Sequence, residues 1–130
     1  MYRCFLAAAV LAAAIAPTAA PAQTQARQFP QDALRGTITF GAPPVIALDG
    51  KVARLAPGGR IRGMDNMLVM SGTLVDRKAV VNYTLEDTTG LVQDVWILTP
   101  AEIKKQPWPT TRAQAAAWTF VPAAQTWIKP

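Results

Sequence analysis

Hydrophobic and polar residues alternate along the middle of the chain. Val81, Tyr83 and Leu85 are separated by single polar residues. Because successive side chains of a strand point to opposite faces, this pattern places the three large side chains on one face of a half-buried β-strand. The same period of two recurs in neighbouring stretches and predicts a mainly β domain over residues 36–99.

Turn-forming residues divide this region into about seven short strands. Asp49-Gly50 is a strong two-residue hairpin signal, and Pro57-Gly58-Gly59 is expected to turn the chain again. Gly72 is expected to bulge or bend a long strand. Short strands joined by tight turns predict a small antiparallel barrel or sandwich. The expected strands cover residues 37–40, 45–48, 51–55, 60–62, 67–75, 79–85 and 91–98.

The pattern changes to helix signals after the last of these strands. Thr99 and Glu102 have the spacing of a capping box, with a proline at the first helical position between them. They predict a short helix that ends before Pro107. Thr111 repeats the capping signal before a run of alanines and predicts a second short helix.

The C-terminal segment is irregular and rich in tryptophan and proline. Its last residues would form a hairpin that sets Phe120 opposite Trp127, a favourable cross-strand aromatic pair. Trp108, Trp118 and Trp127 have two alternative uses. They can pack over a sheet face, or they can form an exposed platform on which sugars or bases stack.

The N-terminal residues have the order of a secretory signal peptide. Arg3 supplies a positive start, a short apolar run follows, and Ala20-Pro21-Ala22 forms a small-residue cleavage site. The apolar run is too short to span a bilayer. We therefore expect cleavage after Ala22 and export to the periplasm or the medium, with no membrane-spanning segment in the mature chain.

The sequence predicts four consecutive segments. The signal peptide is followed by a loose segment, in which Phe29-Pro30 would open a single helical turn that ends at Gly36. A β-domain and a C-terminal segment of short helices and a hairpin, packed on that domain, complete the chain. The expected boundaries are 1–22, 23–35, 36–99 and 100–130.

The residues that are missing exclude several chemistries. The chain has no histidine, and its single cysteine, Cys4, lies in the expected signal peptide. The mature protein would therefore lack histidine bases, cysteine nucleophiles, zinc sites built on these residues, and disulfides. We expect a protein that is not an enzyme and needs no cofactor. The full chain has a formal net charge of +5, of which +4 would remain after cleavage. This excess either keeps a small protein soluble or attracts anionic partners.

Arg54, Arg60 and Arg62 are the strongest candidates for a binding site. They surround the glycine pair of the stretch RLAPGGRIRG, which lacks the lysine and hydroxyl residue of a phosphate-binding P-loop. Arg60 and Arg62 would point the same way from one strand, and a turn would bring Arg54 beside them. Together they would bind phosphate or carboxylate groups. The alternative is an ordinary solvated sheet face.

Three methionines raise the separate hypothesis of a soft-metal site. Met64, Met67 and Met70 are spaced by three residues, and thioethers are ligands for Cu(I). Residues three apart in a strand face opposite sides, however, and methionine is also a common core residue. The copper site is the weakest of the candidate functions.

The mature chain resembles a group of small exported bacterial proteins with no assigned function. The resemblance rests on FPQDALRGTITFGAPPVIALDGKVARLAPGGRIRG, then VNYT, GLVQDVWILTPAE, QPWP and QTWIKP. It implies no activity and no site residues. The strand pattern is also similar to small OB-type barrels of exported bacterial proteins, a likeness of fold alone, and many functions share such folds.

The sequence therefore predicts a non-catalytic binding module of the cell envelope. Its partner would be an anionic polymer, or an unknown envelope protein on which it docks as an accessory subunit. We expect no specific binding of nucleic acid. Copper handling by the methionines is the remaining alternative.

Overall fold

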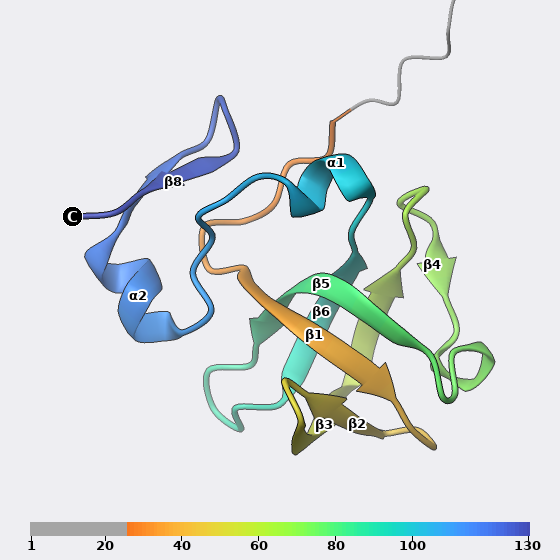
Figure 1. The fold of residues 1–130 in the computed structure, drawn as a ribbon. Coiled ribbons are helices and arrows are strands. Elements are labelled where there is room, and N and C mark those ends of the chain that lie inside the picture. The colour runs from red at the N-terminus through yellow and green to blue at the C-terminus, as the bar shows by residue number, and fades with distance from the viewer. Residues whose placement is uncertain (1–25) are drawn as a thin grey trace, which may run out of the picture.

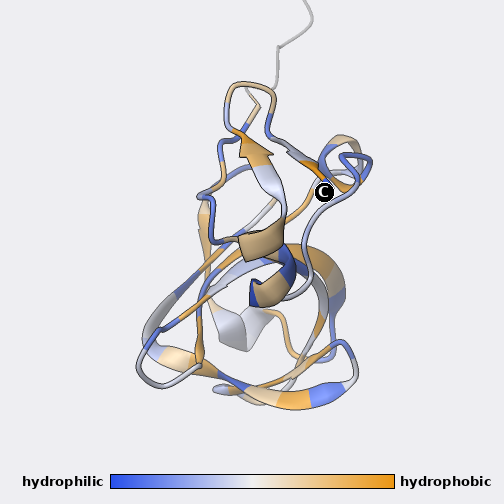
Figure 2. Cartoon of the chain, turned by 90° about the vertical axis from the view of Figure 1, so that its left-hand side faces the viewer, coloured by the Kyte–Doolittle hydropathy of each residue, from blue (hydrophilic) through white to orange (hydrophobic). Residues whose placement is uncertain are grey.

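The computed structural model describes residues 26–130. The predicted signal peptide lies outside the described residues. Hydrophobic and hydrophilic residues alternate along the strands of the barrel (Figure 2). Within the described residues, no helix combines the length and the apolar character needed to cross a bilayer.

In the described part of the chain, five strands close into a small barrel (Figure 1). They are β1 (Leu34–Phe40), β2 (Val45–Leu48), β3 (Lys51–Arg62), β5 (Lys78–Leu85) and β6 (Val92–Ile97). The order is β2-β1-β5-β6-β3, and β3 returns to pair with β2. This confirms the mainly β barrel. The pairing of β3 with β6 is parallel, so the barrel is mixed and not wholly antiparallel.

The interior of the barrel is filled by alternate side chains from every strand. Ile38, Val81 and Val95 are fully buried there, and their neighbours in sequence face outward, as the period of two requires. The Asp49-Gly50 hairpin between β2 and β3 forms as predicted. The other buried members of this core are Leu34, Phe40, Ile46, Ile61, Leu74, Tyr83 and Val92.

The predicted turn at Pro57-Gly58-Gly59 is wrong, because β3 runs through it without reversing. The register with β6 shifts between Leu55 and Arg60, so the extra residues form a bulge. Both flanks of the glycines pair with the same parallel neighbour, which keeps the chain direction. Gly58 has a φ of +75°. A Cβ on Gly59 would lie 2.9 Å from the carbonyl oxygens of Ala56 and Gln93, so this close backbone approach requires glycine.

The expected long strand over residues 67–75 is also wrong. Within this range, the strand is β4 (Leu68–Val69), which forms a short hairpin with the end of β3. A 3₁₀ turn, η1 (Ser71–Thr73), follows at once. The Thr73 hydroxyl donates to the Met70 carbonyl oxygen at 2.7 Å, a local bond that competes with continued strand pairing.

The segment before the barrel is held against it. The expected helical turn is replaced by a single turn in which the Ala33 amide donates to the Pro30 carbonyl oxygen. Gly36 lies inside β1 and ends no helix. Phe29 and Ala33 are buried, so this part of the predicted loose segment packs in the structure.

The C-terminal segment follows its local signals closely. Helix α1 (Pro100–Ile103) begins with the predicted capping box, and α2 (Arg112–Ala117) begins at the second capping threonine. Strands β7 (Thr119–Val121) and β8 (Thr126–Ile128) form the predicted hairpin. Its register sets Phe120 opposite Trp127, which confirms the expected aromatic pair.

A second core lies outside the barrel, between its wall and the C-terminal segment. Phe29, Trp108 and Trp127 pack there with Val80 and Trp96 from the outer side of β5 and β6. In Figure 1, α2 and β8 lie on one flank of the barrel and β4 lies on the other. No such layer from residues 26–130 covers the outer face of β2 and β3, where Val45 and Val52 are exposed.

Candidate functional site

The outer face of β3 carries the three arginines predicted from the sequence. Ile61 points into the barrel core, so its neighbours Arg60 and Arg62 point outward. Arg54 lies opposite Val45 of β2 on the same outer face. Arg54 and Arg60 are exposed and Arg62 is half-buried. This arrangement presents positive charge on the uncovered side of the barrel.

The structure brings two of these arginines together and separates the third. Arg60 and Arg62 are neighbours on one face of β3. Arg54 is six residues from Arg60 along the same strand, a separation of roughly 15–20 Å at the rise of a bulged strand. The expectation that a turn would set Arg54 beside the other two is therefore wrong, because the chain does not reverse.

None of the three arginines forms an ion pair with another described residue. The Arg62 Nη1 donates a long hydrogen bond, 3.4 Å, to the Asn66 carbonyl oxygen. Asp94 of β6 is the register partner of Arg60, but the two side chains form no salt bridge. The guanidinium groups are thus available to an external anion.

A groove crosses β3 beside Arg60. The pairing of β3 with β2 ends at Arg54, and its pairing with β4 begins at Ile61, so one edge of β3 has no strand partner between them. This gap opens as a hollow of about 450 Å³, lined by Pro43, Pro44, the middle of β3, and the chain from Leu68 to Gly72. Most of these lining residues are apolar, and Arg60 supplies a charge.

The three methionines lie around β4. Met64 lies in the turn before β4, Met67 directly precedes it, and Met70 directly follows it. All three side chains are exposed. The Met67 amide is fixed by a hydrogen bond to the Asp65 carboxylate at 3.1 Å. The copper hypothesis stays a prediction. In the described residues, no group of three His, Cys, Asp or Glu side chains is placed to hold a metal ion.

The three tryptophans of the C-terminal segment divide into two buried rings and one partly exposed ring. Trp108 and Trp127 are buried, with their ring centroids 6.2 Å apart. The Arg35 guanidinium lies 4.9 Å from the Trp108 ring. Trp118 is half-buried, with the Lys129 ammonium 5.3 Å from its ring. A stacking platform would therefore fall to Trp118, since the other two rings are enclosed by protein.

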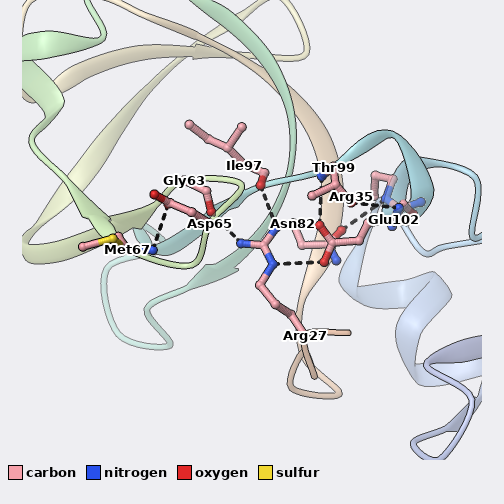
Figure 3. A network of polar contacts seen from close by, with 9 residues as sticks. All are labelled: Arg27, Arg35, Gly63, Asp65, Met67, Asn82, Ile97, Thr99 and Glu102. Atoms are coloured by element: carbon pink, nitrogen blue, oxygen red, sulfur yellow. Dashed lines mark hydrogen bonds and ion pairs between the residues drawn. The ribbon is translucent and has the colours of Figure 1, made fainter. Parts of the chain in front are cut away.

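A buried polar network joins the N-terminal segment to α1 (Figure 3). Arg27 donates from Nε and Nη2 to the two carboxylate oxygens of Glu102, at 3.0 and 2.6 Å. It also donates to the carbonyl oxygens of Gly63 and Ile97, each at 2.7 Å. Glu102 accepts a further bond from the Thr99 amide. We call the Arg27–Glu102 pair with these partners the clasp.

Arg35 forms the second part of this network. Its guanidinium donates to the carbonyl oxygens of Glu102 and Lys105, at 3.2 and 2.8 Å, and so satisfies the C-terminal end of α1. Its Nε donates to the Asn82 side-chain oxygen. Burial lowers the pKa of Arg35 to about 10, and the nearby charge of Glu102 opposes this shift. The guanidinium therefore stays charged at neutral pH.

Sequence reasoning found Glu102 only as a capping residue and missed both arginines. Burial alone would raise the pKa of Glu102, but the hydrogen bonds and charge of Arg27, with the Thr99 bonds, hold it below its ordinary value. Apart from the capping box, no sequence signal pointed to this network, because Arg35 precedes the expected strand over residues 37–40 and lies in β1 only in the structure. Nothing in the polar stretch around Arg27 marks it as buried.

We expect the protein to lose stability in acid more steeply than its Glu102→Gln variant. The lowered pKa of Glu102 means that its carboxylate stabilises the fold above the ordinary value of 4.5. This contribution is lost as the pH falls through the lowered pKa. Urea midpoints measured between about pH 7 and about pH 3 test this. Parallel curves for the two proteins would contradict it.

Among the acidic residues, Asp65 lies in the turn after β3, three residues from Arg62, and Asp94 is the register partner of Arg60. Asp94 and three others gather on another part of the barrel surface. They surround a hollow of about 490 Å³ near the turn between β5 and β6. Arg112 of α2 forms an exposed ion pair with one of them, Asp87, at 3.2 Å. The acidic residues that line this hollow are Asp32, Glu86, Asp87 and Asp94.

Comparison with known proteins adds no family to this geometry. No family model matches the chain, and neither a curated protein nor a solved structure matches it. The fold and the chemistry of its surface therefore carry the functional argument.

Proposed function

We propose that the protein is a non-catalytic binding module that holds an anionic polymeric partner along the outer face of β3. The observation that carries this proposal is the line of Arg54, Arg60 and Arg62, which has no ion pair among the described residues and lies on the uncovered side of the barrel. Guanidinium groups bind phosphate, sulfate and carboxylate groups in bidentate geometry.

The strand order supports the proposal by analogy. A five-stranded barrel in the order β1-β2-β3-β6-β5, with β3 and β6 parallel, resembles small OB-type barrels. Such barrels bind oligonucleotides and oligosaccharides on the face of their second and third strands. The corresponding face here is the exposed outer side of β2 and β3. This is a likeness of fold, and the arginines supply the chemistry.

The spacing of the arginines favours a long ligand over a small ion. Arg60 and Arg62 can contact one anionic group together. Arg54 lies roughly 15–20 Å away along β3, so a ligand must be extended to reach it as well. A polymer with charges repeated along its length meets this requirement, and free phosphate does not.

Retention on immobilised dextran sulfate tests the proposal. We expect the Arg60→Gln/Arg62→Gln variant to elute at lower salt, with an affinity reduced roughly tenfold, because charge-assisted hydrogen bonds are lost. Adding Arg54→Gln should reduce retention further. Inorganic phosphate should compete poorly with the polymer.

The matched control removes two positive charges elsewhere. Lys104 and Lys105 follow α1 and do not line the groove beside Arg60, so Lys104→Gln/Lys105→Gln should elute close to the unmodified protein. If the two double variants elute at the same salt concentration, retention reflects net charge alone and the proposed site is wrong.

The accessory-subunit hypothesis remains the second candidate. Two exposed apolar residues that line the groove, Leu68 and Met70, favour it. Crosslinking in the cell envelope through the β4 region would join the protein to one dominant partner if it acts in this way.

The copper hypothesis predicts that Cu(I) changes the methyl signals of the three methionines, and unchanged signals would exclude it.

A further inference from the structure

Exposed apolar side chains are concentrated around β4. Met64, Met67, Leu68 and Met70 are 54%, 67%, 65% and 79% exposed. They lie within seven consecutive residues, and in Figure 1 β4 stands at the margin of the barrel, on the side away from α2 and β8. Contact between water and a contiguous apolar surface is unfavourable, so an exposed cluster of this kind indicates a contact surface.

The same surface carries two of the free arginines. Arg62 is paired in register with Leu68, and the inward pair beside it is Ile61 with Val69. Arg62 and Leu68 therefore share the outer face of the hairpin. Continuing the antiparallel register sets Met70 beside Arg60. We call the six residues Arg60, Arg62, Met64, Met67, Leu68 and Met70 the β4 face.

We propose that the β4 face docks on the surface of an anionic lipid bilayer. This inference rests on the proposed function, because it narrows the extended anionic partner of Arg60 and Arg62 to a bilayer surface, on which headgroup charges repeat as they do along a polymer. The two guanidinium groups would contact headgroup phosphates. The methionines and Leu68 would enter the boundary between headgroups and acyl chains, as the apolar faces of interfacial proteins do.

Charge complementarity and the composition of the face favour a bilayer. Methionine is flexible and unbranched, which suits a fluid surface, and arginine can extend its charge to the headgroup level while its stem stays in apolar surroundings. Met64 and Met67 lie outside the groove beside β3. A partner that only filled this groove would leave these two side chains in water.

The shape of β4 argues against an added peptide strand. β4 offers two residues of strand edge before the 3₁₀ turn begins. Strand addition draws its affinity from a row of main-chain hydrogen bonds, and so short an edge supplies few. The C-terminal layer, formed by α2 and the β7–β8 hairpin, lies on the other flank of the barrel (Figure 1). Helix α1 lies nearer and lines a hollow with Met64, at one end of the β4 face.

Co-sedimentation with lipid vesicles tests the proposal. The protein is isolated from the cell envelope, and mass spectrometry identifies its N-terminus. We expect binding to vesicles of phosphatidylcholine and phosphatidylglycerol, and little binding to phosphatidylcholine alone. The Leu68→Ser/Met70→Ser variant should bind the anionic vesicles roughly tenfold more weakly, because less apolar area is buried.

The matched control is Val52→Ser. Val52 is 86% exposed at the other end of β3, so the variant removes an exposed apolar side chain without touching the β4 face. Its vesicle binding should stay within roughly twofold of the unmodified protein. Circular dichroism checks that all variants are folded. Equal losses in the two variants would overturn the proposal.

A local probe separates insertion from simple charge attraction. An environment-sensitive dye on Met70→Cys should shift to shorter wavelength with anionic vesicles, and the same dye on Val52→Cys should not. If the protein is retained on dextran sulfate but the dye does not respond, the bilayer proposal fails and the proposed function stands. If neither retention nor vesicle binding occurs, both fail. A photo-crosslinker at position 70 that captures a protein in place of lipid would also overturn the bilayer proposal.

Discussion

Replacing Glu102 by glutamine is expected to lower the free energy of unfolding by about 3–5 kcal/mol. The Arg27 and Glu102 side chains are 9% and 12% exposed, and their closest atoms are 2.6 Å apart. Removing the carboxylate charge leaves the Arg27 guanidinium buried without its counter-ion, which costs more than the pair gains when intact. Urea denaturation at neutral pH measures the difference from the shift of the midpoint.

The exposed pair of Arg112 and Asp87 is the matched control. Its side chains are 52% and 98% exposed, so Asp87→Asn should leave the urea midpoint unchanged within error, because water and salt screen such pairs. A double variant, Arg27→Met/Glu102→Leu, should recover part of the stability lost by Glu102→Gln, since it leaves no buried charge. If Glu102→Gln is as mild as Asp87→Asn, the clasp does not stabilise the fold.

The clasp also connects stability with the proposed binding surface. Arg27 donates to the carbonyl oxygen of Gly63, directly after β3 ends. The turn that carries Met64 begins at this residue, so the clasp fixes the base of the hairpin that presents the β4 face. The same guanidinium is bonded to Ile97 at the end of β6. The ends of two neighbouring strands and the start of α1 are thus tied to one buried side chain.

Local signals in the sequence predicted local structure well. The Asp49-Gly50 hairpin, the Thr99 capping box and the pairing of Phe120 with Trp127 all form. Each depends on residues that are close together in sequence, and each bond or contact is made within the same short segment. The alternation around Val81 predicted the inward face of β5 for the same reason. The expectation of a half-buried strand was wrong, because Asn82 and Thr84 on the outer face are buried as well.

The errors arose where a distant partner decides the conformation. Gly58 and Gly59 satisfy a turn and a bulge equally well, and the parallel pairing with β6 selects the bulge. The burial of Arg35 depends on acceptors in α1 and directly after it, 67 to 70 residues away. Separation of Arg54 from Arg60 follows from the same bulge. No pattern within the arginine-rich stretch itself contains this information.

Replacing Trp108 by alanine is expected to lower the free energy of unfolding by about 3–5 kcal/mol. Trp108 is 5% exposed, and its ring lies in edge-on contact with Phe29, Phe120 and Trp127. Its Nε1 donates to the Ala33 carbonyl oxygen at 3.0 Å, one residue before β1 begins. The substitution would leave a cavity between the barrel wall and the C-terminal hairpin.

Trp118→Ala is the matched control for this substitution, because Trp118 is half-buried at the margin of the same cluster. It should cost clearly less than Trp108→Ala. Trp108→Phe keeps most of the ring packing and loses the bond to Ala33, so an intermediate loss of about 1–3 kcal/mol is expected.

Because Phe29, Ala33 and Trp108 join the C-terminal layer to the first strand, barrel and layer should unfold in one transition. Urea curves followed by near- and far-ultraviolet circular dichroism should therefore coincide in the unmodified protein. A near-ultraviolet signal that is lost first, with the barrel unchanged, would instead show that the layer is an independent appendage.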